Sequence, residues 1–547
     1  MPKKMKNRIC RLIIIAVLIS LVIPAHAQKK SSPADVITPE DLESYVSFLA
    51  SPHLKGRANG EAGLELAQEF IISQAKLLGL KPANGSSYRQ PYTIVRNSID
   101  LEKTKVQIIS AGNDTITIRK PVYQLLPTGP SEFSFEGEVI FAGYGLKQDK
   151  YGYNDFENIK PEGKILLVMN RAPSSEDGKK FFFEGTSWNS FMSIQAKLTF
   201  LMFSKAKAVL IVMDPKSGTK SLEEKNPGIS GELNSSKSLK GEKPVTISMP
   251  GMPKILFVHR SVADELLKGT GYTLEELQNK IDTDLKPQSF EIKGKKLLFN
   301  EAVKTEDITL NNVAACIEGS DPELKNEYVI FSAHSDHIGE SGGRINPGAD
   351  DDASGCAALL SIAEAFQSLE KKPLRSVMFL WVSGEEIGLF GSKSYVDNPL
   401  VPLEKTLVDL NIDMIGRIKG VADTTKDTPM TGPYGVFVIT GNQSSELSAI
   451  ADDIDKSTRL DFDYSLSGRK HPLQLFTRSD HYNFVKNDIP VLFFSSGLHT
   501  DYHEPGDVAE KIDFEKMELI TETIFRIGLT VADKKTRLVV DNPFSKW

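Results

Sequence analysis

The chain has 547 residues, of which 40% are hydrophobic and 25% charged, and its formal net charge is −7. This length exceeds what one ordinary hydrophobic core supports, so two domains are expected. The composition is that of a globular protein, and the negative charge without a long basic segment argues against nucleic acid as a partner.

The first 27 residues have the pattern of a signal peptide. Basic residues lie between Lys3 and Arg11, an apolar run extends from Leu12 to Ile23, and Ala25-His26-Ala27 fits a small-x-small cleavage site. The apolar run is shorter than the roughly 20 residues needed to span a bilayer, so an uncleaved anchor is the less favoured alternative. We therefore expect residues 1–27 to be removed and the mature protein to be periplasmic or secreted, without stable membrane insertion.

Helices are expected at the start of the mature chain. Thr38-Pro39-Glu40-Asp41 combines an N-cap residue, a proline at the first helical position and acidic first-turn residues. Residues 61–78 carry apolar side chains at helical spacing, and Gly79 is placed to end that helix. The stretch from Tyr92 to Leu126 is expected to form short strands.

The pattern changes between residues 127 and 301, where short apolar runs alternate with Gly, Pro, Asn and Ser. Such runs favour a small β-rich module. They lie at residues 137–142, 164–169, 208–213 and 254–258. The polar stretch from Asp214 to Pro244 is expected to be an exposed loop. Because this segment carries one histidine, His259, and no cluster of metal-ligand residues, we expect an accessory domain.

An α/β pattern begins at Asn312. Helical spacing from Ser354 to Leu369 alternates with continuous apolar runs of strand length, which indicates a sheet covered by helices on both faces. These runs lie at residues 328–333, 376–382 and 490–494. Cys316 and Cys356 lie in apolar surroundings, and buried free thiols are favoured there over a single disulfide.

Four short clusters of acidic and histidine residues lie in this last part of the chain, which also holds six of the nine histidines. Three clusters follow predicted strands, and the carboxyl ends of strands meet at one edge of an α/β sheet. Imidazole and carboxylate are zinc ligands, and two zinc ions about 4 Å apart can share a hydroxide while a further carboxylate acts as base. The clusters are His334-Ser335-Asp336, Asp350-Asp351-Asp352, Glu385-Glu386, and Asp413 with His503.

Each cluster also has an ordinary structural interpretation. Glu385-Glu386 alone is more often a solvated helix start, the three aspartates could cap a helix, and His503 could be a loop residue. Most of the clusters lie at strand ends, and their order along the chain suits a two-zinc hydrolytic site. Together these two features favour that site over the separate structural interpretations.

These clusters lie in motifs that resemble those of the co-catalytic zinc aminopeptidases of peptidase family twenty-eight. The family includes bacterial leucyl aminopeptidase-like enzymes, glutamate carboxypeptidases and, more distantly, glutaminyl cyclases. The middle segment, with Gly143-Tyr144-Gly145 and Gly163-Lys164-Ile165, is similar to an inserted protease-associated domain. The motifs of the main domain are residues 333–337, 346–355, 384–392, 412–414, 479–481 and 502–507.

The resemblance implies a three-layer α/β/α zinc exopeptidase domain of the phosphorylase/hydrolase-like kind, with a mixed sheet and an inserted β-rich protease-associated domain. Residues 33–127 and 301–535 would form the discontinuous zinc peptidase domain. Residues 128–300 would form the insertion. Its position before the first catalytic strand makes a lid over the site a hypothesis.

Carried over by motif, the family roles give two Zn²⁺ ions bridged by Asp351, the middle aspartate, which lies at the family's spacing from the base. His334 and Asp413 would complete one metal position, and Glu386 and His503 the other. The resemblance also implies a cis peptide bond between Asp351 and Asp352.

Glu385, the general base, would take a proton from the attacking water and return it to the leaving amine. Asp336 is expected to orient the imidazole of His334 through its carboxylate. Tyr502 could donate to the oxyanion, or could be a packed turn residue. The remaining histidines of this region are expected to support the site or to pack, rather than to bind metal; those considered are His337, His481 and His499.

The favoured function is an exported di-zinc aminopeptidase acting on peptide substrates. A carboxypeptidase of the glutamate carboxypeptidase type is the alternative and would need a basic residue for the terminal carboxylate. A single-zinc cyclase is disfavoured because His334 and Asp413 fit a second metal. A non-catalytic receptor on the same scaffold is disfavoured because the ligands and Glu385 are all present. The candidate basic residues are Arg344, Arg417, Arg469 and Arg478.

Overall fold

The computed structural model describes most of the chain after the first 31 residues. The expected signal peptide lies outside the described residues. The described ranges are 32–112, 114–118, 122–124, 132–183, 197–198, 200–225, 235–242, 252–420 and 429–547.

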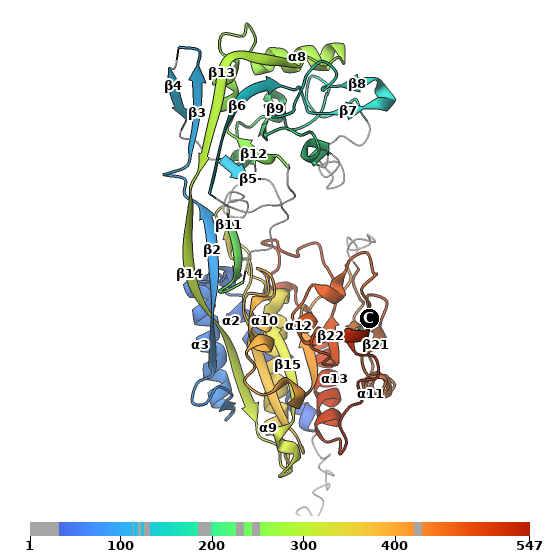
Figure 1. The fold of residues 1–547 in the computed structure, drawn as a ribbon. Coiled ribbons are helices and arrows are strands. Elements are labelled where there is room, and N and C mark those ends of the chain that lie inside the picture. Colours follow the sequence, from blue (N-terminus) through green and yellow to red (C-terminus); the bar gives the residue numbers. More distant parts are fainter. Residues whose placement is uncertain are drawn as a thin grey trace, which may run out of the picture.

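A mixed ten-stranded sheet forms the lower part of the molecule in Figure 1. Its centre holds parallel neighbours in the order β18-β15-β19-β22, flanked by antiparallel strands on both sides. The buried apolar runs predicted at 328–333, 376–382 and 490–494 are confirmed as strands within it. The strands are β1 (Lys81–Pro82), β2 (Arg89–Ile99), β11 (Ser235–Leu239), β14 (Val303–Ile317), β15 (Tyr328–His334), β18 (Ser376–Val382), β19 (Thr406–Ile412), β20 (Gly435–Ile439), β21 (Asp461–Asp463) and β22 (Val491–Ser495).

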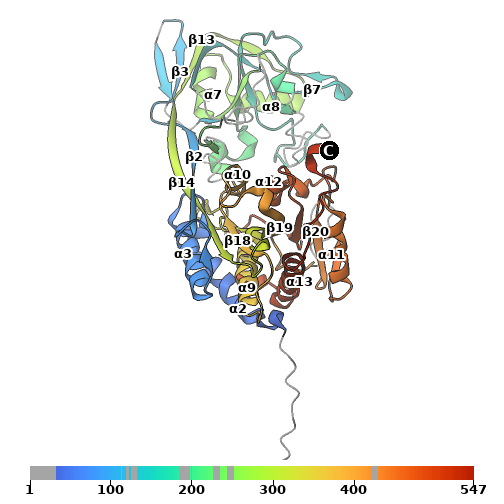
Figure 2. The ribbon, with the colours of Figure 1, turned by 60° about the horizontal axis from the view of Figure 1, so that its bottom comes forward.

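Helices cover both faces of this sheet, as predicted. Alternate residues of β15 show the two faces, because Phe331 packs in one hydrophobic cluster and Ile330 in another. The first face carries α2 (Pro39–Leu49), α3 (Ala62–Leu77), α9 (Gly355–Gln367), α11 (Ser445–Asp455) and α13 (Phe514–Ala532). The second face carries α10 (Phe390–Asp397) and α12 (His481–Val485). Figure 2 shows α2, α9 and α13 grouped together, in agreement with their mutual contacts.

The helix start predicted at Thr38 is confirmed by its cap. The Thr38 hydroxyl oxygen accepts the backbone N–H of Asp41 at 3.2 Å, and Pro39 occupies the first helical position. This cap satisfies one of the N–H groups that a helix start leaves without an intrahelical partner.

A second, eight-stranded sheet forms the upper part of the molecule in Figure 1. Hydrophobic clusters lie on both of its faces, so it has a core of its own. Helices α7 (Arg260–Leu267) and α8 (Leu274–Asp284) pack against it. Its strands are β3 (Lys105–Ser110), β4 (Thr115–Ile118), β5 (Val122–Gln124), β6 (Phe133–Phe141), β9 (Ile165–Met169), β10 (Ala208–Val212), β12 (Lys254–Val258) and β13 (Phe290–Glu301).

Two features of the pairing differ from the expected division of the chain. Strands β3, β4 and β5 pair within the second sheet, so the chain crosses between sheets near residue 100 rather than at 127–128. Strand β11, expected in a polar loop, pairs with β2 of the first sheet. Its serines and lysine carry no hydrophobic alternation, so backbone pairing at a sheet edge, not side-chain burial, forms this strand.

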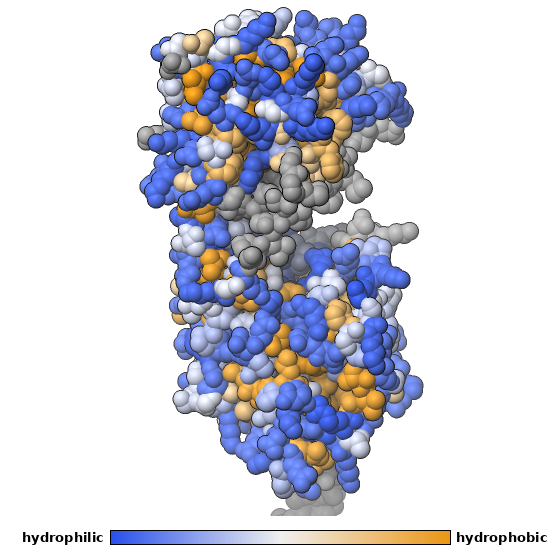
Figure 3. Space-filling model, in the orientation of Figure 1, coloured by the Kyte–Doolittle hydropathy of each residue, from blue (hydrophilic) through white to orange (hydrophobic). Residues whose placement is uncertain are grey.

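The long strands β2 and β14 lie side by side and, with β13, connect the two parts (Figures 1 and 2). Figure 3 shows hydrophilic residues over most of the described surface of both parts, with scattered hydrophobic patches. No described helix combines the length and apolarity that crossing a membrane requires. Cys316 and Cys356 are free thiols, the second of them fully buried.

Candidate metal centre

The four clusters converge at the carboxyl edge of the parallel strands, as predicted. His334 is the last residue of β15, and Asp413 directly follows β19. Glu385 and Glu386 follow β18, and His503 lies in the loop beyond β22. Residues far apart in sequence therefore meet because neighbouring parallel strands end together.

His334, Asp351 and Asp413 form the first cluster of possible metal ligands. His334 Nε2 lies 3.1 Å from Asp351 Oδ1 and 3.6 Å from Asp413 Oδ1. His334 is almost fully buried and Asp413 nearly so. One imidazole nitrogen and two carboxylate oxygens therefore face a common point, a donor set that suits zinc.

The second cluster contains Asp351, Glu386, His503 and, unexpectedly, His337. His503 Nε2 lies 2.9 Å from Glu386 Oε2 and 3.2 Å from Asp351 Oδ2. His337 Nδ1 lies 2.8 Å from Glu386 Oε1 and 3.7 Å from Asp351 Oδ2. His337, expected to support the site or to pack, lies as close to Glu386 as His503 does and somewhat farther from Asp351.

Asp351 belongs to both clusters, and its two neighbours in the chain do not. The carboxylate of Asp352 accepts the backbone N–H groups of His334 and Gly355, and that of Asp350 accepts the N–H of Gly416. The outer aspartates thus hold the backbone while the middle one projects between the clusters. The peptide bond between Asp351 and Asp352 is cis, as the resemblance implies.

The carboxylates of the second cluster attract positive charge. Burial acts to lower the pKa of His503, but the adjacent carboxylates of Asp351 and Glu386 outweigh it and raise that pKa to about 10. Such an accumulation of buried carboxylates needs a cationic partner, which a bound metal ion provides.

Glu385 stands apart from both clusters and lines the cavity beside the first one, together with His334, Asp351 and Asp413. Burial raises the pKa of the Glu385 carboxyl well above its ordinary value. A carboxylate with a raised pKa is a better proton acceptor near neutral pH.

Asp336 makes contacts that differ from the expected one. His334 Nδ1 lies 3.1 Å from the backbone carbonyl of Asp336, while the Asp336 carboxylate is 3.9 Å away. That carboxylate instead accepts the backbone N–H groups of Glu385 and Glu386, each at 3.3 Å, and the Asn59 side-chain amide at 2.6 Å. Asp336 therefore positions the Glu385-Glu386 backbone, because its carboxylate binds the N–H groups of the segment that follows β18.

Tyr502 also lines the cavity. Its ring stacks on that of His503 with centroids 3.9 Å apart, and Arg478 Nη2 donates to its hydroxyl oxygen at 3.4 Å. Burial raises the pKa of the Tyr502 hydroxyl, so the group keeps its proton as a donor.

The other two surplus histidines lie apart from the ligand clusters. His481 is buried, stacks on Phe493, and has Nε2 2.9 Å from the Phe476 carbonyl oxygen. His499 Nε2 lies 3.4 Å from Asp350 Oδ2.

Arg57 supports the centre in a way that sequence reasoning did not foresee. Its buried guanidinium donates five hydrogen bonds, all to backbone carbonyls. Three of these carbonyls belong to the loop that carries Asp351, so one side chain holds the backbone of that loop. The acceptors are the carbonyl oxygens of Leu49, Ser335, Pro347, Gly348 and Asp351.

A hydrogen bond from Ser479 orients the Asp413 carboxylate. Ser479 Oγ donates to Asp413 Oδ2 at 2.7 Å and accepts from Asn411 Nδ2 at 2.9 Å. The Ser479-Asp480-His481 motif pointed to this region, but nothing in its pattern indicated which residue would contact Asp413.

The cavity beside the first cluster is small, about 40 Å³, and opens to solvent. One wall is apolar and is formed by Met414, Leu475, Phe493 and Leu498. Of the four arginines considered for carboxylate binding, Arg478 lines this cavity. The other three lie elsewhere: Arg344 is exposed, Arg417 pairs with Asp501, and Arg469 stacks near Phe544.

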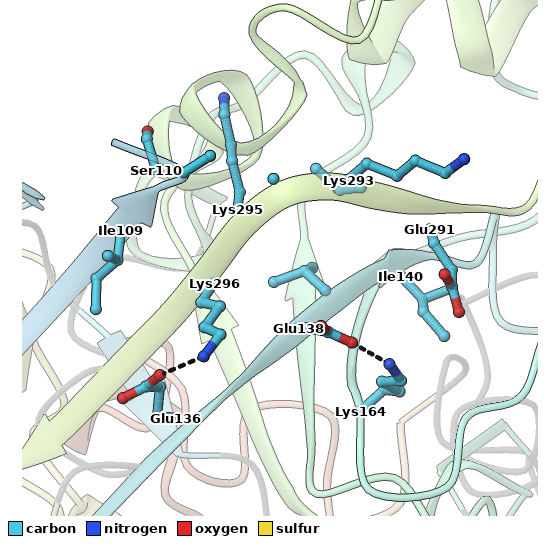
Figure 4. A pocket seen from close by; sticks show the side chains of 14 residues that line it. Ile109, Ser110, Glu136, Glu138, Ile140, Lys164, Glu291, Lys293, Lys295 and Lys296 are labelled. Carbon is cyan, nitrogen blue, oxygen red and sulfur yellow. Dashed lines mark hydrogen bonds and ion pairs between the residues drawn. The ribbon is translucent and has the colours of Figure 1, made fainter. Parts of the chain in front are cut away.

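A second cleft lies in the upper sheet, and half of the residues that line it are charged (Figure 4). Glu136 pairs with Lys296 at 3.2 Å, and Glu138 pairs with Lys164. These acids already have lysine partners, and within the described ranges both ligand clusters lie in the lower part.

Comparison with known proteins identifies related sequences for the segment that holds both clusters. Residues 312–527 match peptidase family M28. The chain is 30% identical over 216 residues to leucine aminopeptidase 2 of Trichophyton equinum, covering 36% of this chain and 38% of that protein. It is 32% identical over 200 residues to a probable leucine aminopeptidase 2 of Aspergillus oryzae, covering 36% and 35%. The matched segment thus spans less than half the length of these curated relatives.

Two solved structures resemble the whole chain more distantly. An aminopeptidase from Aneurinibacillus sp. strain AM-1 aligns with a TM-score of 0.49 and 18% identity, covering 93% of this chain and 97% of that one. A zinc aminopeptidase from Bacillus subtilis aligns with a TM-score of 0.49 and 19% identity, covering 93% and 98%.

Proposed function

We propose that this chain, whose residues 312–527 belong to peptidase family M28, is an exported di-zinc aminopeptidase. The observation that carries the proposal is the pair of ligand clusters sharing Asp351, with Glu385 beside them and outside both. A shared carboxylate joining two clusters, with a second carboxylate facing the cavity, suits hydrolysis by a metal-activated water.

The residues present fit two zinc ions. Both clusters offer imidazole nitrogen and carboxylate oxygen, and buried ligand atoms such as Glu386 Oε1 and His503 Nε2 make no hydrogen bond within the described residues. His334, Asp351 and Asp413 would hold one ion; Asp351, Glu386 and His503 the other. Bound zinc lowers the pKa of its water and polarises a carbonyl group.

Glu385 would act as general base and then general acid. Its carboxylate accepts a proton from the attacking water, and the water oxygen forms a bond to the scissile carbonyl carbon. The protonated Glu385 then gives that proton to the amine nitrogen as the C–N bond breaks. Proton transfer by a positioned side chain contributes about 10²–10⁴-fold to a rate. Tyr502 would donate a hydrogen bond from its hydroxyl to the carbonyl oxygen as charge develops there, and would keep its proton.

Charge in the cavity favours binding of an amino terminus. Glu385, Asp351 and Asp413 line it together with one cation, Arg478. With zinc bound, Asp351 and Asp413 are offset by the metal charge, and Glu385, which lies outside both clusters, supplies the carboxylate that a free α-ammonium would approach. The apolar wall formed by Met414, Leu475, Phe493 and Leu498 would then take an apolar N-terminal side chain. The names of the fungal relatives, leucine aminopeptidases, agree with this preference.

Arg478 is the observation that supports the carboxypeptidase alternative. It lines the cavity and makes no ion pair within the described part of the chain. A guanidinium in this position could bind a substrate carboxylate. A paired assay separates the two functions: an aminopeptidase cleaves leucyl peptides with free amines and leaves N-acetylated ones intact. Cleavage of N-acetylated peptides from the carboxyl end would overturn the aminopeptidase assignment.

The catalytic role of Glu385 has its own test. We expect Glu385→Gln to lower kcat by about 10²–10⁴-fold while the zinc content stays unchanged, because the amide cannot accept the proton. Exposed Glu404 offers a matched control, since Glu404→Gln removes a carboxylate far from the cavity. Wild-type turnover by Glu385→Gln would refute this mechanism, whereas a metal-loaded wild-type protein without any turnover would revive the non-catalytic receptor alternative.

Export and the role of the upper domain belong to the same proposal. The signal-peptide pattern of residues 1–27 predicts a shortened mature protein in the periplasm or medium, which N-terminal sequencing of the purified protein tests.

We also propose that the upper, protease-associated domain covers the cavity as a lid. Because β3, β4 and β5 pair within the second sheet, the deletion that removes every strand of this sheet covers residues 103–301. It should change turnover on short and long peptides differently, and unchanged turnover on both would count against a lid.

A further inference from the structure

We propose that His337 is a direct ligand of the second metal position, which then has four protein ligands and holds its ion more tightly than the first. The inference rests on the proposed metal centre and goes beyond it. Family motifs assign Glu386 and His503 to this position together with Asp351, and leave His337 without a role. The geometry of His337 is the evidence for adding it.

His337 and His503 approach the same two carboxylates from different directions. His337 Nδ1 lies 2.8 Å from Glu386 Oε1, and His503 Nε2 lies 2.9 Å from Glu386 Oε2. The two rings meet edge to face, with centroids 5.7 Å apart and planes 70° apart. Two ligands at zinc distances of about 2.0–2.2 Å in tetrahedral geometry lie about 3.3 Å apart. The nitrogen–oxygen separations in the second cluster, 2.8–3.7 Å, bracket that value.

His337 has no other partner that would explain its position. Its side chain is fully buried, and neither ring nitrogen makes a hydrogen bond within the described residues. Glu386 Oε1, 2.8 Å away, is also without a hydrogen bond, so the two atoms are close without being aligned as donor and acceptor. Buried polar atoms normally have partners. Two such atoms that converge without bonding each other are arranged as ligands of a common ion.

The ring of His337 is held in this place by the backbone around it. The His337 N–H donates to the Arg57 carbonyl at 3.1 Å. Gly348, with a φ of +63°, lies against the ring, and a Cβ atom there would come within 2.6 Å of its carbons. The imidazole is therefore confined between backbone and carboxylates and stays in the ligand position before an ion arrives.

The two metal positions consequently differ. His334, Asp351 and Asp413 all line the cavity and supply three protein ligands, which leaves the first position open to water and substrate. His337 and Glu386 do not line that cavity, and with His337 the second position has four protein ligands. Closed four-ligand zinc positions serve structure, and three-ligand positions with an open site serve catalysis. The second position should fill first and release its ion last.

Zinc titration of the metal-free protein against a chromophoric chelator measures the two affinities. We expect two sites of unequal affinity in the wild-type protein, and we expect His337→Gln to weaken the tighter site at least about 10-fold while leaving the weaker one unchanged. Exposed His53 provides the control substitution, His53→Gln, which should change neither. An unchanged tight site in His337→Gln would overturn the inference. Wild-type protein that binds no zinc would instead overturn the proposed metal centre.

A residue that only supports a ligand can also alter affinity about 10–100-fold, so direct contact needs its own readout. His337→Cys provides it, because Nδ1 is the ring nitrogen nearer to the backbone and the longer zinc–sulfur distance of about 2.3 Å compensates for the shorter side chain. With Co²⁺ in place of zinc, a thiolate ligand adds a charge-transfer absorption in the near ultraviolet. We expect that band in His337→Cys and not in the wild-type protein, whose Cys356 sulfhydryl donates to the His334 carbonyl. Absence of the band in cobalt-loaded His337→Cys would exclude direct ligation.

Discussion

Removing the Ser479 hydroxyl tests how the first metal position is oriented. Ser479 Oγ donates to Asp413 Oδ2 at 2.7 Å, while Asp413 Oδ1 faces His334. Ser479→Ala deletes that bond and leaves Asn411 Nδ2 without its acceptor at 2.9 Å. Asp413 is then free to rotate, and one of the three ligands of the first position loses its fixed direction.

The size of the effect follows from these contacts. A hydrogen bond to a charged group contributes about 1.5–3 kcal/mol, and loss of a partner behind a metal ligand typically lowers affinity about 10–100-fold. The two figures agree, since 10–100-fold corresponds to about 1.4–2.7 kcal/mol. We therefore expect Ser479→Ala to weaken zinc binding at the first position by 10–100-fold and to leave the second position nearly unchanged.

Chelator competition on the metal-free protein measures this change. Ser361→Ala is a matched control, because Ser361 is equally buried and its hydroxyl makes no hydrogen bond within the described residues. The control should bind zinc as the wild-type protein does. Equal affinity of the first position in Ser479→Ala and wild type would refute the argument that this hydroxyl orients Asp413.

Three further predictions concern stability and metal dependence. Arg57→Lys replaces five N–H donors by at most three, so we expect about 3–6 kcal/mol lower stability, and an unchanged urea midpoint would contradict this. Burial raises the pKa of Asp409 from 3.8 to about 8, so the stability that its protonated form contributes is full below pH 3.8 and is lost as pH rises through 8. Asp409→Asn should therefore flatten the fall of the urea midpoint between pH 4 and 8, and an equally steep fall would argue against a protonated Asp409. Chelation of zinc should abolish hydrolysis and lower the thermal midpoint, because the buried carboxylates lose their cation. Addition of zinc should restore both. A thermal midpoint that does not change with zinc would contradict the assignment of a metal centre.

The protonation of Asp409 also explains the direction of donation in the chain of hydrogen bonds that leads to Asp413. The Ser332 hydroxyl lies within hydrogen-bond distance of Asp409 Oδ1 and Asn411 Oδ1, but it has one proton to give. A protonated Asp409 donates to Ser332, which donates to Asn411, whose amide donates to Ser479. The chain of donors then ends on the Asp413 carboxylate. This direction follows from burial, which keeps the proton on Asp409 near neutral pH.

The buried strands could be predicted from sequence because their signal is local. Runs such as Tyr328–Ala333 and Ser376–Val382 are continuously apolar at strand length, and each is confirmed in the centre of the sheet. Strand β11 carries no such signal, since its serines form a strand only by pairing with β2. Strands β3, β4 and β5 likewise join the second sheet through long-range pairing. The residue types at those positions do not predict which sheet the strands join.

The sequence by itself determined which kinds of side chain meet at the centre, because strand ends carry the histidines and carboxylates and parallel strands end at one edge. Tertiary structure alone decided where each side chain points. Asp351 projects because Asp350 and Asp352 bind backbone N–H groups, and Asp336 binds the backbone after β18 although its spacing from His334 suggested otherwise. His337 becomes a candidate ligand because the surrounding backbone confines its ring. These directions depend on hydrogen bonds between segments far apart in the chain, and a local pattern of residues carries no information about such partners.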